Sequence, residues 1–200
     1  MAVNGETDPV ARKMDKFPPL TVVSGGQDLL RRRFVAEVVS VQRRAGWAIV
    51  EVDGALPGAV REALNGDMFD PRETLAVVLS PEAADLELLE RHHGSQGALT
   101  TLLLHIEGEP DGRTKFGKVV KTAWAAVHKS FPLPTEWKAP QVALDFVQAE
   151  ATRQGFQMPA ALAQALVERS GTDLGVLAFE MQKILILTKL AGTTMVDVAH

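Results

Sequence analysis

The segment Val22–Asp28 combines residue types that could bind a phosphate group. Two valines lead into Ser24, Gly25 and Gly26, and a stretch rich in arginine follows them. Many nucleotide-binding domains hold phosphate between a strand and a helix, because N–H groups at the helix start donate to phosphate oxygens. A working phosphate loop, G-x-x-x-x-G-K-[ST], also needs a lysine for the outer phosphates and a hydroxyl for magnesium. This segment supplies the glycines only, and the Asp28 carboxylate repels phosphate.

ATP hydrolysis also needs an acidic pair at the end of a buried strand, which holds magnesium and polarises water. The apolar run Leu75–Leu79 leads instead into Ser80–Glu82. The G-x-G-x-x-G pattern of dinucleotide-binding domains is absent from the first turn as well. We therefore predict that Gly25 and Gly26 form a degenerate phosphate loop, a tight turn without catalysis, and that the chain binds no cofactor.

The other reactive side chains form no recognisable catalytic or metal site. The chain has no cysteine, which excludes disulfides, zinc ribbons and thiol nucleophiles. His92 and His93 are adjacent, so on a helix they point in different directions and cannot bind one metal together. We expect a solvated helix end there, and structural roles for His105 and His128, which lie in or beside apolar runs. Ser170 lacks a nucleophile elbow.

Two clusters of basic residues are candidates for contact with nucleic acid. Five arginines load one predicted helix, where we expect a solvated face: Arg31, Arg32, Arg33, Arg43 and Arg44. Three lysines follow Arg113 in a stretch without acids and are the candidate DNA contacts: Lys115, Lys118 and Lys121. The formal net charge of -4 argues against a protein that coats nucleic acid generally.

The hydrophobic pattern predicts the elements that position these side chains. The chain has 200 residues, of which 46% are hydrophobic and 23% charged, and this is ordinary for a globular protein. Short apolar runs rich in β-branched residues predict strands at Leu20–Val23, Trp47–Val52, Leu75–Leu79, Leu99–Leu104 and Ala123–Val127. Helices are predicted between them at 27–44, 57–64 and 81–93. Runs that are apolar on both faces are typical of strands buried between helix layers, which predicts a parallel α/β sheet.

No strand is predicted after Pro140. Helical spacing and glycine stops indicate three short helices that begin at Pro140, Pro159 and Thr172 and end near Gly155, Gly171 and Gly192. These helices must bury their apolar stripes against one another, which predicts a small helical lid. We expect a flexible N-terminal tail over 1–16, an α/β domain over 17–137 and the helical domain over 138–200. The tail lacks the apolar run of a signal peptide, so we expect a cytoplasmic protein with no membrane partner.

An apolar pair, Met68-Phe69, lies among turn formers and charges between Gly66 and the strand that begins at about Leu75. Loops run over protein surfaces, so two large apolar side chains in one need an explanation. Either they fold back onto the neighbouring helix, or they form an exposed wedge for a protein partner. Taken alone, the segment favours the first interpretation.

The order of these features resembles the delta subunit of the bacterial DNA polymerase III clamp loader, over about residues 17–200. The first turn, at Gly25 and Gly26, contains no lysine. The apolar pair Met68-Phe69 follows later in the chain, and Arg72 stands between this pair and the strand that begins at about Leu75. The family pattern Gly-x-Asp-Leu-x-x-Leu-x-x-Glu-x-x-Lys-Leu is matched at Gly171, Asp173, Leu174, Leu177, Glu180 and Lys183, with Ile184 in place of the last leucine. The family often has an acidic residue directly after the first-turn glycine, whereas Gln27 stands there in this chain.

The resemblance implies an AAA+-type parallel-sheet domain without ATP motifs, followed by a three-helix lid. It implies a catalytically silent subunit of the polymerase III holoenzyme that binds the sliding clamp and opens one of its interfaces. Other loader subunits are implied as partners, with primer–template DNA contacted indirectly. In that family the apolar pair is the clamp-contacting wedge, which by position is Met68 and Phe69, and we expect Asp67, Asp70 and Arg72 at its rim. The family's third, helical collar domain is expected to be absent from this chain.

Two other functions stay open from the residues themselves. A diverged P-loop NTPase needs a lysine from elsewhere in the chain, for which Lys115 and Lys118 are candidates, and it predicts ATP turnover. A DNA-binding adaptor with a helical module predicts a salt-dependent DNA affinity that weakens when Lys115, Lys118 or Lys121 is changed.

Overall fold

The structure is a computed structural model that describes residues 18–65, 72–95 and 98–190. Contacts within the chain divide it into two compact units, Met1–Pro132 and Leu133–His200. The sheet lies in the first of these units.

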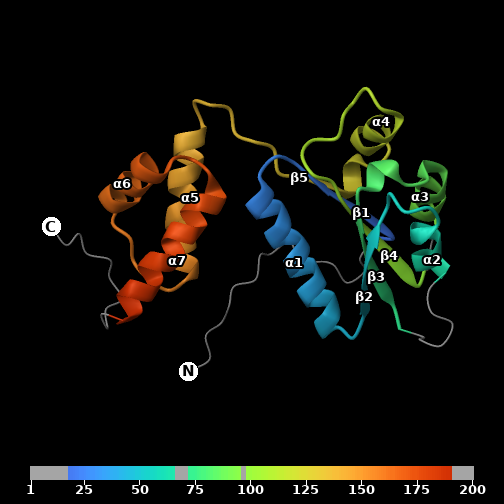
Figure 1. Ribbon diagram of the computed structural model, residues 1–200, viewed down its shortest axis with the longest axis horizontal. Coiled ribbons are helices and arrows are strands. Elements are labelled where there is room, and N and C mark those ends of the chain that lie inside the picture. The colour runs from blue at the N-terminus through green and yellow to red at the C-terminus, as the bar shows by residue number, and fades with distance from the viewer. Residues whose placement is uncertain (1–17, 66–71, 96–97, 191–200) are drawn as a thin grey trace. The chain divides into compact units, whose positions relative to one another are not determined.

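The described residues of the first unit form a five-stranded parallel sheet. Its strands are β1 (Leu20–Ser24), β2 (Ala48–Asp53), β3 (Thr74–Leu79), β4 (Thr100–His105) and β5 (His128–Ser130). They lie in the order β2-β3-β4-β1-β5, and all four pairings are parallel (Figure 1). The predicted α/β fold with a parallel sheet is confirmed. The order leaves β2 and β5 at the two edges, and it places β1 between β4 and β5.

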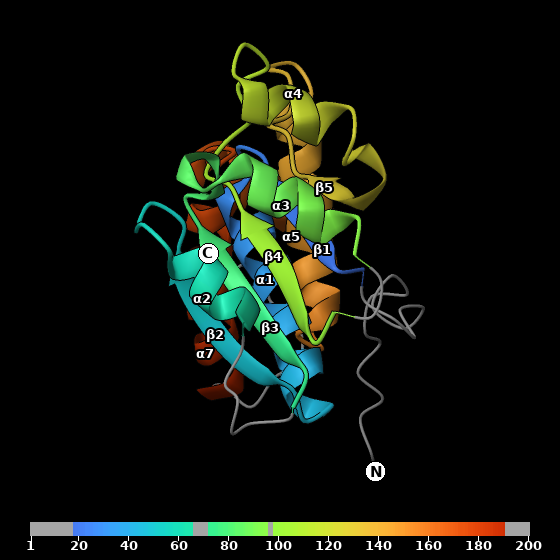
Figure 2. The same cartoon turned by 90° about the vertical axis from the view of Figure 1, so that its right-hand side faces the viewer.

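Helices cover both faces of the sheet, because successive side chains of a strand point to opposite sides. The helix α1 (Asp28–Arg44) packs on one face through Val38, together with Val23, Leu75 and Leu103. The other face carries α2 (Ala59–Asn65), α3 (Leu86–His93) and α4 (Lys115–Lys121), whose apolar residues join the larger core cluster. Figure 2 shows α2 and α3 in front of the sheet and α1 behind it.

The strand predicted at Ala123–Val127 is wrong. Ala125–Val127 form a 3-10 turn, η3, and the strand that pairs with β1 is His128–Ser130. Trp124 is only 1% exposed and meets the Phe116 ring edge-on, with 5.9 Å between ring centroids. Burying this side chain in the core beside α4 holds the segment in a turn, so the apolar run is explained by Trp124 and not by a strand.

The helix predicted over 81–93 is divided in two. Pro81–Ala83 form a 3-10 turn, η2, and α3 begins only at Leu86. The Asp85 side chain accepts a hydrogen bond from the Leu88 N–H at 3.2 Å. This N-cap satisfies an N–H that has no partner within the helix, and so it fixes the start of α3.

The described part of the second unit, up to residue 190, forms three helices, α5 (Ala139–Arg153), α6 (Ala160–Ser170) and α7 (Leu174–Leu190). Their buried residues include Val147 of α5, Val167 of α6, and Leu177 and Met181 of α7. The predicted cap of α7 is off by one residue, because Asp173 and not Thr172 accepts the Val176 N–H, at 2.9 Å. The glycine expected to end α7, at position 192, lies outside the described residues.

Candidate functional site

In the turn between β1 and α1, backbone N–H groups donate hydrogen bonds to carbonyl groups of the protein itself. Gly25 has a φ of +118° and donates its N–H to the Gly108 carbonyl at 2.7 Å. The Gln27 N–H donates to the Phe131 carbonyl at 3.0 Å, and the Phe131 N–H donates back to Ser24 at 2.8 Å. A phosphate at a helix start needs such N–H groups unoccupied. Two of the groups that a phosphate would use here are already bonded to carbonyls.

Arg31 fills the space beside this turn. It is 3% exposed, donates from Nη1 to the Gly25 carbonyl at 2.5 Å and from Nε to His105 Nε2 at 2.9 Å, and pairs with Asp28. The solvated position expected for this arginine is therefore wrong, although Arg32 is exposed as expected. The Arg31 and Arg32 guanidinium groups both bind the Asp28 carboxylate, the latter at 2.7 Å.

Three histidines hold internal hydrogen bonds near the sheet. His105 Nε2 must be unprotonated, because the Arg31 group that it meets can only donate. His128 Nε2 and the buried Ser24 Oγ are 2.6 Å apart, and His92 Nε2 is 3.0 Å from the Pro19 carbonyl. His92 is buried, so the solvated helix end expected there is wrong at this residue. Burial lowers the pKa of all three imidazoles, and the Arg31 charge lowers the pKa of His105 further.

These three pKa shifts predict that acid weakens the fold. Each folded-state pKa lies below the unfolded value of about 6.5, so folding favours the neutral ring. Their stabilising contribution is complete above that pH, and it declines as the pH falls below it toward the folded-state pKa values. We expect the urea midpoint to be lower at pH 5.5 than at pH 7.5. The variant His105→Gln, whose amide oxygen can accept from Arg31 at either pH, should lose less, and an equal loss in both proteins would contradict this assignment.

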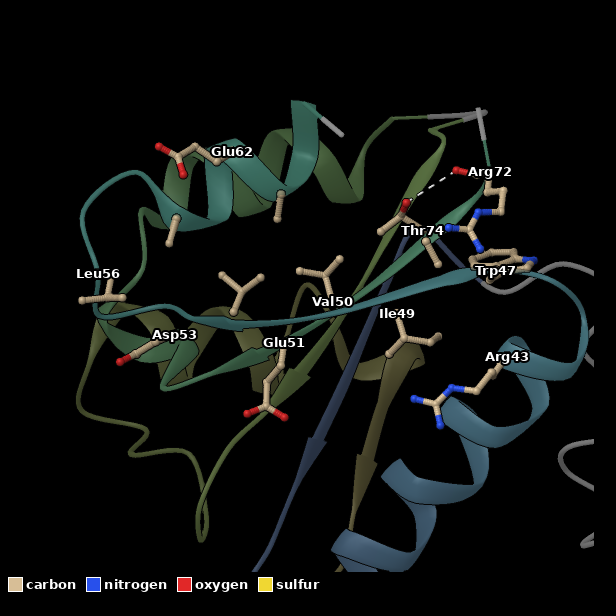
Figure 3. Close-up of a pocket in the computed structure, with 14 residues that line it drawn as sticks. Arg43, Trp47, Ile49, Val50, Glu51, Asp53, Leu56, Glu62, Arg72 and Thr74 are labelled. Atoms are coloured by element: carbon tan, nitrogen blue, oxygen red, sulfur yellow. Dashed lines mark hydrogen bonds between the residues drawn. The ribbon is translucent and has the colours of Figure 1, made fainter. Parts of the chain in front are cut away.

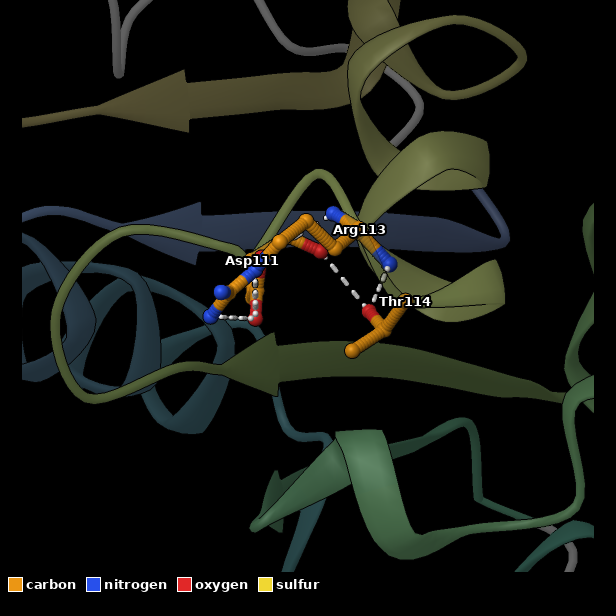
Figure 4. A network of polar contacts seen from close by, with 4 residues as sticks. Asp111, Arg113 and Thr114 are labelled. Atoms are coloured by element: carbon orange, nitrogen blue, oxygen red, sulfur yellow. Dashed lines mark hydrogen bonds and ion pairs between the residues drawn. The ribbon is translucent and has the colours of Figure 1, made fainter.

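The basic stretch before α4 contains one internal ion pair. Arg113 forms a bidentate pair with the Asp111 carboxylate, with Nη2 2.9 Å from Oδ2 (Figure 4). Thr114 caps α4 by accepting the Gly117 N–H at 3.0 Å. The three candidate lysines, Lys115, Lys118 and Lys121, are exposed on α4 while Phe116 and Val120 are buried. The cationic surface of α4 therefore consists of lysines, because Asp111 offsets the charge of Arg113.

The predicted wedge cannot be placed, because Asp67, Met68, Phe69 and Asp70 lie outside the described residues. Arg72 is described. It is exposed just before β3, and its carbonyl accepts from the Thr74 hydroxyl at 3.5 Å. Its side chain lines a groove along β2 that the sequence did not predict.

This groove, of about 820 Å³, runs along the edge strand β2 (Figure 3). Arg43, Trp47 and Arg72 line the end where β2 starts, and Asp53 and Leu56 line the end where it stops. Val50, midway along, is 41% exposed. The sequence predicted a strand buried on both faces here. The charged Glu51 within the apolar run was the signal of an edge strand, since a fully buried strand would leave that carboxylate without water.

The second unit exposes several large apolar side chains. On α7 these are Val176, Phe179, Ile186, Leu187 and Leu190, opposite the residues that pack against α5 and α6. Within the described part of the chain, no three acidic or histidine side chains gather where they could hold a metal ion. No described helix is both long and apolar enough to cross a bilayer.

Comparisons with known proteins identify the fold and leave the family open. No protein-family model and no curated protein sequence matches the chain. Among solved structures it is similar to the Bacillus subtilis DNA clamp loader delta protein (YqeN), with a TM-score of 0.63 and 18% sequence identity. The match covers 92% of this chain and 57% of that protein, so this chain spans a little over half the length of the matched structure.

Proposed function

We propose that this chain is a delta-type clamp-loader subunit, which binds a sliding clamp and opens it for loading onto DNA. The observation that carries the proposal is the likeness to a clamp loader delta protein over 92% of this chain. The sequence pattern at Gly171–Ile184 points in the same direction independently of the fold. The remaining partners are other loader subunits, with primer–template DNA reached through the assembly in the cytoplasm.

The clamp-binding residues under this proposal are Met68 and Phe69, with Asp67, Asp70 and Arg72 around them. Burying the two apolar side chains contributes about 1.5–3 kcal/mol each. Shifting a partner from mostly closed to mostly open takes roughly 5.5 kcal/mol of differential affinity. The apolar pair can therefore supply much of the opening energy, and contacts at its rim must supply the rest. Opening then uses binding energy and needs no ATP from this chain.

The test of the function is a titration of the purified chain into its cognate sliding clamp, followed by calorimetry. Saturable binding supports the proposed clamp binding. The proposed clamp opening is tested separately, by the change in energy transfer between two fluorophores placed across one clamp interface. Absence of binding by a folded chain would overturn the proposal. A diverged NTPase would instead turn over ATP in the absence of any clamp.

ATP is expected not to bind at Gly25 and Gly26. The Gly25 and Gln27 N–H groups are occupied, and Arg31 and Asp28 are paired with each other beside the turn. Calorimetry with magnesium and ATP should show no saturable heat at concentrations up to the millimolar range. Saturable binding that disappears when Gln27 is changed to glutamate would contradict this expectation directly, because that change adds a second carboxylate to the turn.

The three lysines of α4 are the proposed DNA contacts of this subunit. Lys115, Lys118 and Lys121 are exposed on one short helix, and Phe116 and Val120 anchor that helix in the core. Contacts of lysine with phosphate carry no sequence information, so this surface would add affinity for DNA within the assembled loader without choosing a sequence.

A further inference from the structure

The outer edge of β2 presents backbone groups that no other described strand pairs with. Ala48 donates its N–H to the Glu73 carbonyl at 2.9 Å, and Gly54 donates to the Leu79 carbonyl at 2.7 Å. The even-numbered residues between these two bonds therefore face β3, because backbone groups alternate sides along a strand. Ile49 and Glu51 point their N–H and C=O groups away from β3. Among the described residues no strand pairs with that side.

The surface around this edge is shaped to take an added strand. The groove is bounded on one side by Arg43 at the end of α1 and on the other by Ala59 and Ala63 of α2. Figure 3 shows Ile49 and Glu51 on the α1 side of β2 and Val50 on the α2 side. An extended backbone laid along β2 gains main-chain hydrogen bonds, and the alternating side chains on the two faces give specificity.

The charges along the groove reverse from one end of β2 to the other. Arg43 reaches beneath Ile49 near the start of the strand, while Glu51 and Asp53 occupy its second half (Figure 3). Consider an added strand that also has a basic group at its start and acidic groups in its second half. If it runs antiparallel to β2, its acidic groups lie near Arg43, and its basic group lies near Glu51 and Asp53. The β2 strand of a second copy of this chain has this property.

We propose that a second copy of this chain pairs with the outer edge of β2 in antiparallel orientation, about a two-fold axis through Val50. Ile49 of each copy then faces Glu51 of the other, and each such pair exchanges two N–H···O bonds. The carboxylate of Glu51 lies beside the Ile49 of the second copy, within the region that Arg43 of that copy reaches. The contact is self-complementary, as a two-fold interface requires.

Charge disfavours the register whose axis lies one residue further along β2. Moving the axis by one residue to Glu51 would set two Glu51 carboxylates directly opposite each other, and like charges in that position destabilise a strand pair. An axis at Val50 instead sets two partly exposed valines opposite each other and separates the carboxylates.

Sedimentation velocity of the purified chain over a concentration series tests the proposal. The wild-type chain should show a concentration-dependent dimer. Each reversal, Arg43→Glu or Glu51→Arg, should raise the dimer dissociation constant by at least about tenfold, since both copies lose the pair at once. The doubly reversed variant should return to within about threefold of the wild type, because it restores the pair with opposite sign. Glu90→Arg on α3, an equal charge change away from the groove, should leave the constant unchanged.

Three results would overturn the proposal. One is a wild-type chain that stays monomeric at the highest concentration measured. Another is a dimer that both single reversals leave unchanged, and a third is a dimer lost in Phe179→Asp on α7 while Glu51→Arg has no effect. Neither Arg43 nor Glu51 belongs to the proposed clamp-binding residues, so failure here and failure of clamp binding are separate results.

Discussion

Replacing Met68 and Phe69 together by alanine is expected to weaken binding of the cognate sliding clamp by at least about 30-fold. This corresponds to about 2 kcal/mol, the loss that defines a central hot spot of a protein interface. The reason is that two large apolar side chains lose nearly all of the surface that they would bury in the clamp. Calorimetric titration of the variant into the clamp, beside the wild type, gives the ratio of dissociation constants.

The control for this result is a second apolar pair on the same chain. Phe179 and Leu187 are 62% and 65% exposed on α7, and they belong to no proposed clamp contact. Changing both to alanine removes a comparable apolar area and should leave clamp affinity within about threefold. The unfolding midpoint of each variant checks that it is folded. An unchanged affinity in a folded Met68→Ala, Phe69→Ala variant would remove the wedge assignment.

Gly25→Ala is expected to lower the free energy of unfolding of the first unit by at least about 3 kcal/mol, a size that is diagnostic of strain or overpacking. A Cβ at this position would lie 2.2 Å from the Phe131 carbonyl oxygen and 2.3 Å from its carbon. Both atoms belong to the backbone, so they cannot move aside as a side chain does. The φ of +118° adds strain for any residue with a Cβ. Urea unfolding followed by circular dichroism measures the loss.

Gly58→Ala separates the two causes. Gly58 also has a positive φ, +82°, but a Cβ there would meet nothing within 4 Å. Its loss should therefore reflect backbone strain only, about 1 kcal/mol. If Gly25→Ala cost no more than Gly58→Ala, close packing of the first turn against Phe131 could not be the reason that glycine stands at position 25.

Secondary-structure elements that depend on residues adjacent in the sequence were predictable from the sequence. The short apolar runs rich in β-branched residues that end at Val23, Val52, Leu79 and Leu104 identify four of the five strands, since each run depends on its own residues. The fifth was misassigned because Trp124 and η3 supply an apolar run without strand geometry. The site residues divide in the same way. Arg72 was named as a candidate from the segment before β3, whereas the groove along β2 went unrecognised.

The sequence by itself determined that the first turn has glycines without a phosphate-loop lysine, and that strands alternate with helices before a helical C-terminal part. The tertiary structure decided what fills that turn. Arg31 bonds to His105, 74 residues along the chain, and Ser24 approaches His128, 104 residues along. It also decided that β2 lies at an edge. These contacts and the edge position of β2 depend on which strands become neighbours in the sheet. No local pattern of residues specifies contacts between residues 74 or 104 positions apart. The Gly25 N–H holds the turn to Gly108 and the Gln27 N–H holds it to Phe131, through donor groups that a phosphate would otherwise take.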